Sequence, residues 1–173
     1  MNIISKFKEI KNLSARRENV IFFFLISIIF SFDRISKIKI LENFSDRKYF
    51  VNNYINFDLI WNTGVGFGLL SANSYLIYNL ITLIVGIVIM VLFYVSYISK
   101  YTDKLILSVI IGAALGNFYD RLSYNAVPDF IDLHFNNFHW FTFNVADIFI
   151  TLAIILYIMK NYLVKMKDKN EKN

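Results

Sequence analysis

The sequence predicts an all-α integral membrane protein with four transmembrane helices and a small strand-containing region outside the membrane. Hydrophobic residues make up 57% of the 173 residues and charged residues only 18%, whereas soluble globular chains carry about 25% charged residues. Four apolar stretches each approach the roughly 20 residues that cross a bilayer. Basic residues gather at the ends of these stretches. The chain length predicts one membrane-embedded domain covering residues 1–173.

We expect the four spans at about residues 20–41, 75–98, 105–122 and 145–164. The second contains no charged residue, and a buried helix of a soluble protein is rarely so long and so uniformly apolar. The first follows a basic leader and so imitates a secretory signal peptide. Phe32, Asp33 and Arg34 stand where a cleavage site needs small residues, so we expect this span to be retained.

The distribution of basic residues predicts the orientation in the membrane. Five Lys or Arg residues precede Val20, Lys100 and Lys104 lie in the short turn between the second and third spans, and five Lys residues follow from Lys160 onward. The positive-inside rule therefore places both termini in the cytoplasm. Residues 42–74, the strand-containing segment, and residues 123–143, an aromatic loop, are expected on the outer side. The net charge of +5 thus lies at membrane edges, which disfavours nucleic acid as a partner.

Unusual polar residues occur near the outer ends of the spans. Asp33 and Lys37 are spaced i, i+4, which suits an ion pair on one helix face. A carboxylate within an apolar span costs about 2.5–3.5 kcal/mol on insertion scales, so Asp33 is a candidate for a functional role. In the third span, Gly112 and Gly116 form a small-xxx-small pattern that favours close helix packing.

The outer segments contain further candidate groups. Three of the six glycines lie within residues 64–68, after Asn62, and predict a turn rather than a phosphate-binding loop. Asn117, Asp120 and Arg121 share one face at the end of the third span, although Arg121 alone would also suit a headgroup anchor. Asn144 is suited to cap the fourth span, with Asp147 on the same face.

Asp129, which follows the only proline of the chain, is expected to meet Asp147 at the outer membrane edge. Two carboxyl groups in a poorly hydrated site cannot both ionise cheaply, so one keeps a proton. That arrangement allows one to act as a base and the other as an acid. The same arrangement leaves open an alternative function, a small proton- or ion-conducting subunit that uses paired acids, although the sequence shows no internal repeat.

Metal and thiol chemistry are not expected. The chain has no cysteine, which excludes disulfides and a thiol nucleophile. His134 and His139 lie in an aromatic stretch, and their spacing without cysteine is not typical of a zinc-binding motif. We therefore interpret them as part of an interfacial aromatic surface. We therefore predict no metal site and no cofactor.

Taken together, these segments resemble the lipoprotein signal peptidases (signal peptidase II), four-span aspartyl proteases of bacterial inner membranes. The resemblance lies in five segments in family order, which are Asp33 to Lys37 (D-x-x-S/T-K), Asn62 to Phe67 (N-x-G-x-A/G-F), Gly116 to Arg121 (G-N-x-x-D-R), Val127 to Phe130 (V-x-D-F) and Phe143 to Asp147 (F-N-x-A-D). Pro128 beside the acid and Asn125, where the family often has glycine, depart from the pattern. Asn tolerates left-handed geometry, so the second departure is mild.

The resemblance implies a catalytic dyad of Asp129 and Asp147, with Asn62, Gly64, Asn117, Arg121 and Asn144 lining the substrate and inhibitor site. It also implies that Asp33 and Lys37 support the site and that Asp120 orients Arg121. Such an enzyme cleaves prolipoproteins before a diacylglyceryl-modified cysteine at the outer side of the inner membrane. It works as a monomer among membrane lipids, without a cofactor, and is blocked by globomycin-type inhibitors.

Overall fold

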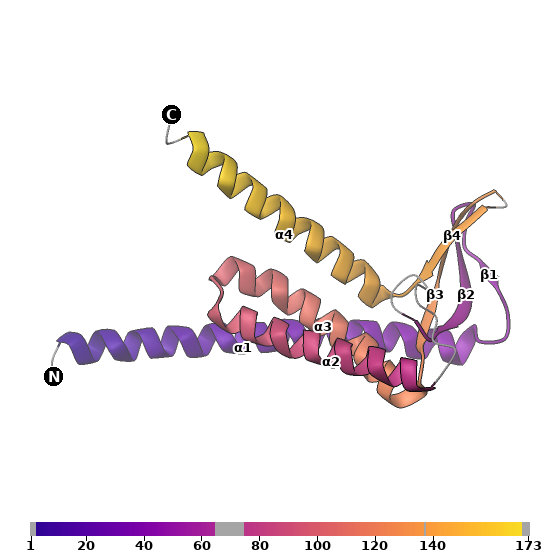
Figure 1. The fold of residues 1–173 in the computed structure, drawn as a ribbon, viewed down its shortest axis with the longest axis horizontal. Coiled ribbons are helices and arrows are strands. Elements are labelled where there is room, and N and C mark those ends of the chain that lie inside the picture. Colours follow the sequence, from indigo (N-terminus) through magenta and orange to yellow (C-terminus); the bar gives the residue numbers. More distant parts are fainter. Residues whose placement is uncertain (1–2, 65–74, 137, 171–173) are drawn as a thin grey trace.

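The computed structural model of the chain describes residues 3–64, 75–136 and 138–170, with side chains described from Arg17 onward. Four long helices and a small sheet make up the fold (Figure 1). In chain order the elements are α1 (Ile3–Asn43), β1 (Tyr49–Phe50), β2 (Ile55–Asn62), α2 (Tyr75–Ile98), α3 (Tyr101–Tyr124), β3 (Val127–Phe135), β4 (Phe138–Phe143) and α4 (Val145–Asn170).

All four helices are long and apolar enough to cross a membrane, which confirms a multi-pass membrane protein. Helix α2 covers the expected span, residues 75–98, from end to end. The other three helices extend past their apolar stretches, and the candidate span within α1 is Arg17–Asn43. Charged residues at helix ends do not stop the helix, because they remain in water or among headgroups while the backbone hydrogen bonds continue.

Helix α3 lies at the centre of the bundle and packs against each of the other three helices. One apolar cluster joins Ile29 of α1, Ala113 of α3 and Ala146 of α4. A Cβ atom added to Gly112 would lie 2.7 Å from the carbonyl oxygen of Ile26, so only glycine permits this approach of α1 to α3. The predicted packing role of the small-residue pattern is confirmed. Helix α4 packs against α3 through Ala153 and stays in contact with α3 as far as Lys160, which pairs with Asp103.

The two outer segments form one four-stranded antiparallel sheet in the order β1-β2-β3-β4. The sequence predicted strands only in residues 42–74, and the description of residues 123–143 as an aromatic loop was incomplete. Strands β3 and β4 form a hairpin in which His134 and His139 are direct partners, and β3 also pairs with β2, from Ile55 opposite Leu133 to Asn62 opposite Val127. Central strand β3 is largely buried, so its residues do not show the clean polar alternation of a half-exposed strand.

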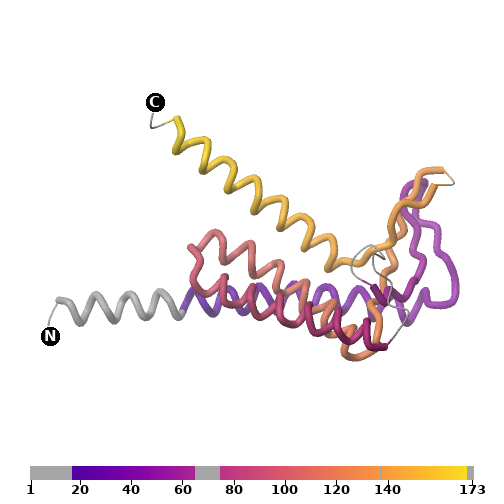
Figure 2. Tube along the Cα trace, in the orientation of Figure 1, coloured from indigo at the N-terminus to yellow at the C-terminus, as the bar shows by residue number. Residues whose placement is uncertain are grey.

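The sheet lies at one end of the helical bundle, and the first turns of α1 and the last turns of α4 lie at the other end (Figure 1). The Cα trace in Figure 2 shows β2, β3 and β4 running side by side beyond the helix ends. Asn125 ends α3 with a left-handed backbone (φ 55°), as its identity predicted. The chain then enters β3 and returns to α4 through β4. The C-terminal end of α3 and the start of α4 are thereby held against the sheet.

Candidate active site

Asp129 lies in β3 with 2% of its surface exposed, and both of its carboxylate oxygens accept hydrogen bonds. Asn62 Nδ2 donates to Oδ2 at 2.8 Å, and Asn144 Nδ2 donates to Oδ1 at 2.6 Å. Asn62 ends β2 and Asn144 follows β4, so the sheet brings all three residues together. The β4 partners of β3 begin only at Ile131. Pro128 therefore has a strand neighbour on one side alone, where the lack of an N–H group is tolerated.

Asp147 lies in the first turn of α4, where it forms a reciprocal cap with Asn144. The Asp147 backbone N–H donates to Asn144 Oδ1 at 3.1 Å, and the Asn144 backbone N–H donates to Asp147 Oδ2 at 3.2 Å. This is the geometry of a capping box with aspartate at its third helical position. Asn117 Nδ2 of α3 donates to the other oxygen, Oδ1, at 2.9 Å. Helix formation itself thus fixes the orientation of the Asp147 carboxyl group.

Asn144 contacts both candidate acids and is fully buried. The two carboxyl groups also interact electrostatically. Burial raises the pKa of Asp129, and the negative charge of Asp147 raises it further, to about 7, against the hydrogen bonds from Asn62 and Asn144. A carboxyl group with this pKa is partly protonated at neutral pH. Asn144 thus brings Asp129 and Asp147 together where the sheet meets the bundle, and the location of this end at the outer membrane edge stays a prediction.

A buried network behind the two acids begins at Lys37, whose side chain has no exposed surface. Lys37 Nζ lies 2.7 Å from Asp33 Oδ2, 2.7 Å from Asp120 Oδ2 and 2.7 Å from Asn117 Oδ1. The amide of Asn117 accepts from Lys37 through its oxygen and donates to Asp147 through its nitrogen. Lys37 therefore sets which way the Asn117 amide faces.

Asp33 connects this network to α4. Its Oδ1 accepts a hydrogen bond from the Ala146 backbone N–H at 3.0 Å, which satisfies one of the free N–H groups at the start of the helix. The negative charge also lies favourably near the positive end of the helix dipole. The expected ion pair between Asp33 and Lys37 is present. The hydrogen bond from Ala146 to Asp33 holds the start of α4 against α1.

The resemblance implies that Asp120 orients Arg121, but among the described residues no hydrogen bond or ion pair joins the two side chains. Asp120 instead forms ion pairs with Lys37 and Arg34. Adjacent residues on a helix point in different directions, which is why the neighbouring Arg121 is not its partner. The sequence analysis missed Arg34 as a partner. The available signal was a second basic residue beside Asp33 inside an apolar span.

Arg121 is also buried, which contradicts a role as a headgroup anchor. Its Nη2 donates a hydrogen bond to the backbone oxygen of Gly64, and the Gly64 N–H donates to Asn62 Oδ1 at 2.8 Å. Within the described residues, Arg121 Nη1 has no hydrogen-bond partner. Arg121, Gly64 and Asn62 thus form one side of the site. The rest of the glycine-rich segment, from Val65 to Phe67 and on through Gly68, lies outside the described residues.

An apolar cleft of about 280 Å³ opens beside Asp147, between the β3–β4 hairpin and the start of α4. Asp147 is the only charged residue among those that line it, which are Leu133, Phe141, Phe143, Asp147, Ile148, Thr151 and Leu152. A larger groove of about 870 Å³ between α2 and α3 contains neither acid. Of these two cavities, only the small cleft reaches one of the candidate acids, Asp147.

Comparison with known proteins agrees with this site. The family model described as signal peptidase (SPase) II matches residues 25–163. The lipoprotein signal peptidase of Pelagibacter ubique (strain HTCC1062) is 43% identical over 86% of this chain and 92% of its own length. The enzyme of the same name from Anaplasma phagocytophilum (strain HZ) is 35% identical over 82% of this chain and 92% of its own length.

A solved structure agrees as well. It is described as a bacterial membrane enzyme determined by the in meso method at 2.3 Å resolution, and it is 26% identical to this chain. It covers 88% of this chain and 91% of its own, with a TM-score of 0.68. The family match covers every described segment of the site, from Asp33 on α1 to Asp147 on α4, and the chain belongs to the signal peptidase II family.

Proposed function

We propose that this protein is an aspartic endopeptidase that removes signal peptides from prolipoproteins, cleaving before the diacylglyceryl-modified cysteine at the outer side of the bacterial inner membrane. The observation that carries the proposal is the position of two carboxyl groups, Asp129 and Asp147, held by one buried Asn144 where the bundle meets the sheet. The family match and the names of the relatives support the substrate class.

In the proposed mechanism, Asp129 holds the shared proton and Asp147 acts as the base. Asp147 takes a proton from a water molecule, whose oxygen forms a bond to the carbonyl carbon of the scissile peptide. Asp129 gives its proton to the carbonyl oxygen, which would otherwise carry a negative charge. The tetrahedral intermediate then collapses. Its former carbonyl oxygen returns the proton to Asp129, Asp147 gives its proton to the amine nitrogen, and the C–N bond breaks. The products are the signal peptide carboxylate and the cysteine amine, and both acids regain their starting states.

The surroundings of the acids suit a lipid-anchored, extended substrate. The cleft beside Asp147 suits aliphatic groups, because the described residues that line it are apolar apart from Thr151 and Asp147. On the other side, Nη1 of Arg121, which has no hydrogen-bond partner among the described residues, would donate to a substrate carbonyl oxygen. Asn62 donates a hydrogen bond to Asp129 and Asn117 donates one to Asp147, so each amide orients one acid. A globomycin-type inhibitor would occupy the same space between Asp129 and Asp147.

The alternative, an ion-conducting subunit with paired acids, is not supported. Conduction needs a polar path through the bundle. The acids instead gather at the sheet end, and the cleft next to Asp147 is apolar. The family to which the chain belongs consists of peptidases.

The decisive experiment measures cleavage of a diacylglyceryl-modified prolipoprotein by the purified enzyme in detergent. Asp129→Asn and Asp147→Asn should each lose nearly all turnover, because an amide cannot exchange the required proton. The double variant should be little worse than either single variant, since the two groups act as one unit. Asp58→Asn, at a 38% exposed side chain on β2, is the matched control and should keep its rate. If a folded Asp129→Asn or Asp147→Asn enzyme cleaved at a near wild-type rate, Asp129 and Asp147 would not be the catalytic pair.

A further inference from the structure

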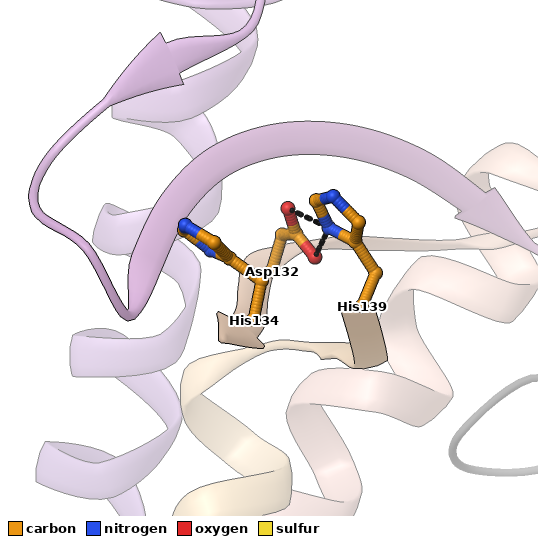
Figure 3. A group of neighbouring side chains, drawn as sticks. All are labelled: Asp132, His134 and His139. Carbon is orange, nitrogen blue, oxygen red and sulfur yellow. Dashed lines mark hydrogen bonds and ion pairs between the residues drawn. The ribbon is translucent and has the colours of Figure 1, made fainter. Parts of the chain in front are cut away.

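Two histidines and one aspartate meet on the β3–β4 hairpin, outside the acid pair (Figure 3). His134 and His139 are direct partners across the two strands, and their rings stack with centroids 5.3 Å apart. Asp132 lies between them, and one ligand atom of each residue lies within 4.8 Å of the others. The sequence spacing argued against a metal site here, because it gave no account of the hairpin that brings positions 134 and 139 together.

Two imidazole rings and one carboxylate come together in one small region. Both carboxylate oxygens of Asp132, which is 3% exposed, lie 2.8 Å from His139 Nδ1. His134 Nδ1 lies 3.2 Å from the Asn56 amide nitrogen, a donor, so this ring nitrogen is the acceptor. The same Asn56 nitrogen lies 3.3 Å from Asp132 Oδ2. N–H donors thus occupy the region that a metal cation would fill.

The charged group that now balances Asp132 is exposed and has a second partner. Lys48 Nζ lies 2.9 Å from Asp132 Oδ2 and 3.2 Å from Asp58 Oδ2, with 42% of its side chain exposed. Because Lys48 is exposed to solvent and also pairs with Asp58, its ammonium group can leave Asp132 and still have a charged partner.

We propose that Asp132, His134 and His139 bind one divalent transition-metal ion of the Zn²⁺ class, and that Lys48 is the cation with which the metal competes. Two imidazoles and one carboxylate are ligands that suit zinc, with water completing a tetrahedron. Zinc bonds of about 2.0–2.2 Å place tetrahedral ligand atoms about 3.4 Å apart. A bound ion would therefore draw the three ligand atoms, which now lie within 4.8 Å of one another, closer together. The ion would link β3 to β4 three residues beyond Asp129, and it takes no part in the cleavage chemistry.

Zn²⁺ titration of the tag-free enzyme, stripped with EDTA, tests the proposal by calorimetry and by thermal unfolding in detergent. We expect one bound ion per chain and a rise in melting temperature with added Zn²⁺, because a ligand that binds only the folded state stabilises it. Asp132→Asn and His134→Phe should each weaken binding at least tenfold. Lys48→Gln should bind Zn²⁺ several-fold more tightly, which adventitious surface binding would not show.

Two controls separate this site from the acid pair. The double variant Asp129→Asn/Asp147→Asn should bind Zn²⁺ like the wild type, and cleavage by the wild type should persist in EDTA. Circular dichroism and gel filtration of each metal-free variant establish that it is folded. The proposal is overturned if the folded wild type binds no Zn²⁺, if His134→Phe leaves the affinity unchanged, or if binding is lost only in the double variant.

Discussion

Asn144 performs three tasks with one side chain and one backbone N–H group. Its Nδ2 donates to Asp129, its Oδ1 caps α4, and its N–H donates to Asp147. The sequence was sufficient to predict the cap and the shared face of Asn144 and Asp147, because both follow from local helix geometry. It was not sufficient to predict the path from Lys37 through Asn117 to Asp147, since those partners are 80 and 30 residues apart in sequence.

Replacing Asn144 with alanine should lower the cleavage rate about 100-fold, because both carboxyl groups lose their common partner. Loss of the cap should also destabilise the protein by about 1 kcal/mol. Steady-state cleavage and thermal unfolding in detergent measure the two effects. Asn43→Ala is the matched control, because the Asn43 side chain is exposed and, among the described residues, donates a single hydrogen bond, to the Lys39 backbone oxygen. An Asn144→Ala enzyme with an unchanged rate would show that the acids need no bridge.

The raised pKa of Asp129 predicts how stability depends on pH. In the folded state this pKa is about 7, above the ordinary value of 3.8, so the folded protein holds the proton more tightly than the unfolded chain. The resulting stabilisation is complete below about pH 4 and is lost as the pH rises to and beyond 7. The melting temperature of the wild type should therefore fall more steeply between pH 5 and pH 8 than that of Asp129→Asn.

The same ionisation should limit activity. Above about pH 7 both acids become charged and the proton donor is lost, so the cleavage rate should fall on the alkaline side of a bell-shaped profile. The apparent pKa values belong to the pair. A cleavage rate that stays constant from pH 6 to pH 9 would contradict the assignment of the proton to Asp129.

Helix α1 positions the acids through its contact with α3 and α4. Asp33 of α1 reaches the Ala146 N–H of α4 only because Gly116 of α3 leaves room for its carboxylate. Spans such as α2 were predictable, since twenty apolar residues in succession fit only a membrane helix. Strands β3 and β4 were not predictable. The buried central strand β3 does not alternate apolar with polar residues, and its pairing with β2 joins segments that lie far apart in the chain.

Gly116→Ala should impair both stability and cleavage. The added Cβ overlaps the Asp33 carboxylate, which is itself fixed by Lys37 and by the helix start, so the helices must separate. Overpacking of this kind costs about 1–3 kcal/mol. Thermal unfolding and cleavage rates in detergent measure the loss.

Gly86→Ala provides the matched control for this substitution. A Cβ added at Gly86 would lie 3.2 Å from the Phe118 ring, a side chain that faces the open groove between α2 and α3 and is free to turn. Alanine is also the better helix former. Gly86→Ala should therefore keep its activity and most of its stability. Equal losses in the two variants would show that the contact of Gly116 with Asp33 has no special importance.

In the whole molecule, the candidate acid pair and the ends of the chain lie at opposite ends of the bundle. The acid pair, the sheet and the apolar cleft lie at one end of the bundle, and the helix ends that begin and finish the chain lie at the other (Figure 1). At that far end Lys160 pairs with Asp103, which joins α4 to α3. The positions of the Lys and Arg residues predict that this far end faces the cytoplasm.

Reporter fusions test the orientation directly. A reporter active only outside the cytoplasm, such as alkaline phosphatase, should be inactive when fused after Asn170 or in the turn at Lys100. It should be active when inserted at Asn53, beside β1 and β2 in the sheet. The physical reason is that the short, basic α2–α3 turn and the basic tail resist translocation, whereas residues 123–143 carry no Lys or Arg. An active reporter after Asn170 would place Asp129 and Asp147 in the cytoplasm, where exported prolipoproteins do not present their cleavage site, and the proposed function would then fail together with the orientation.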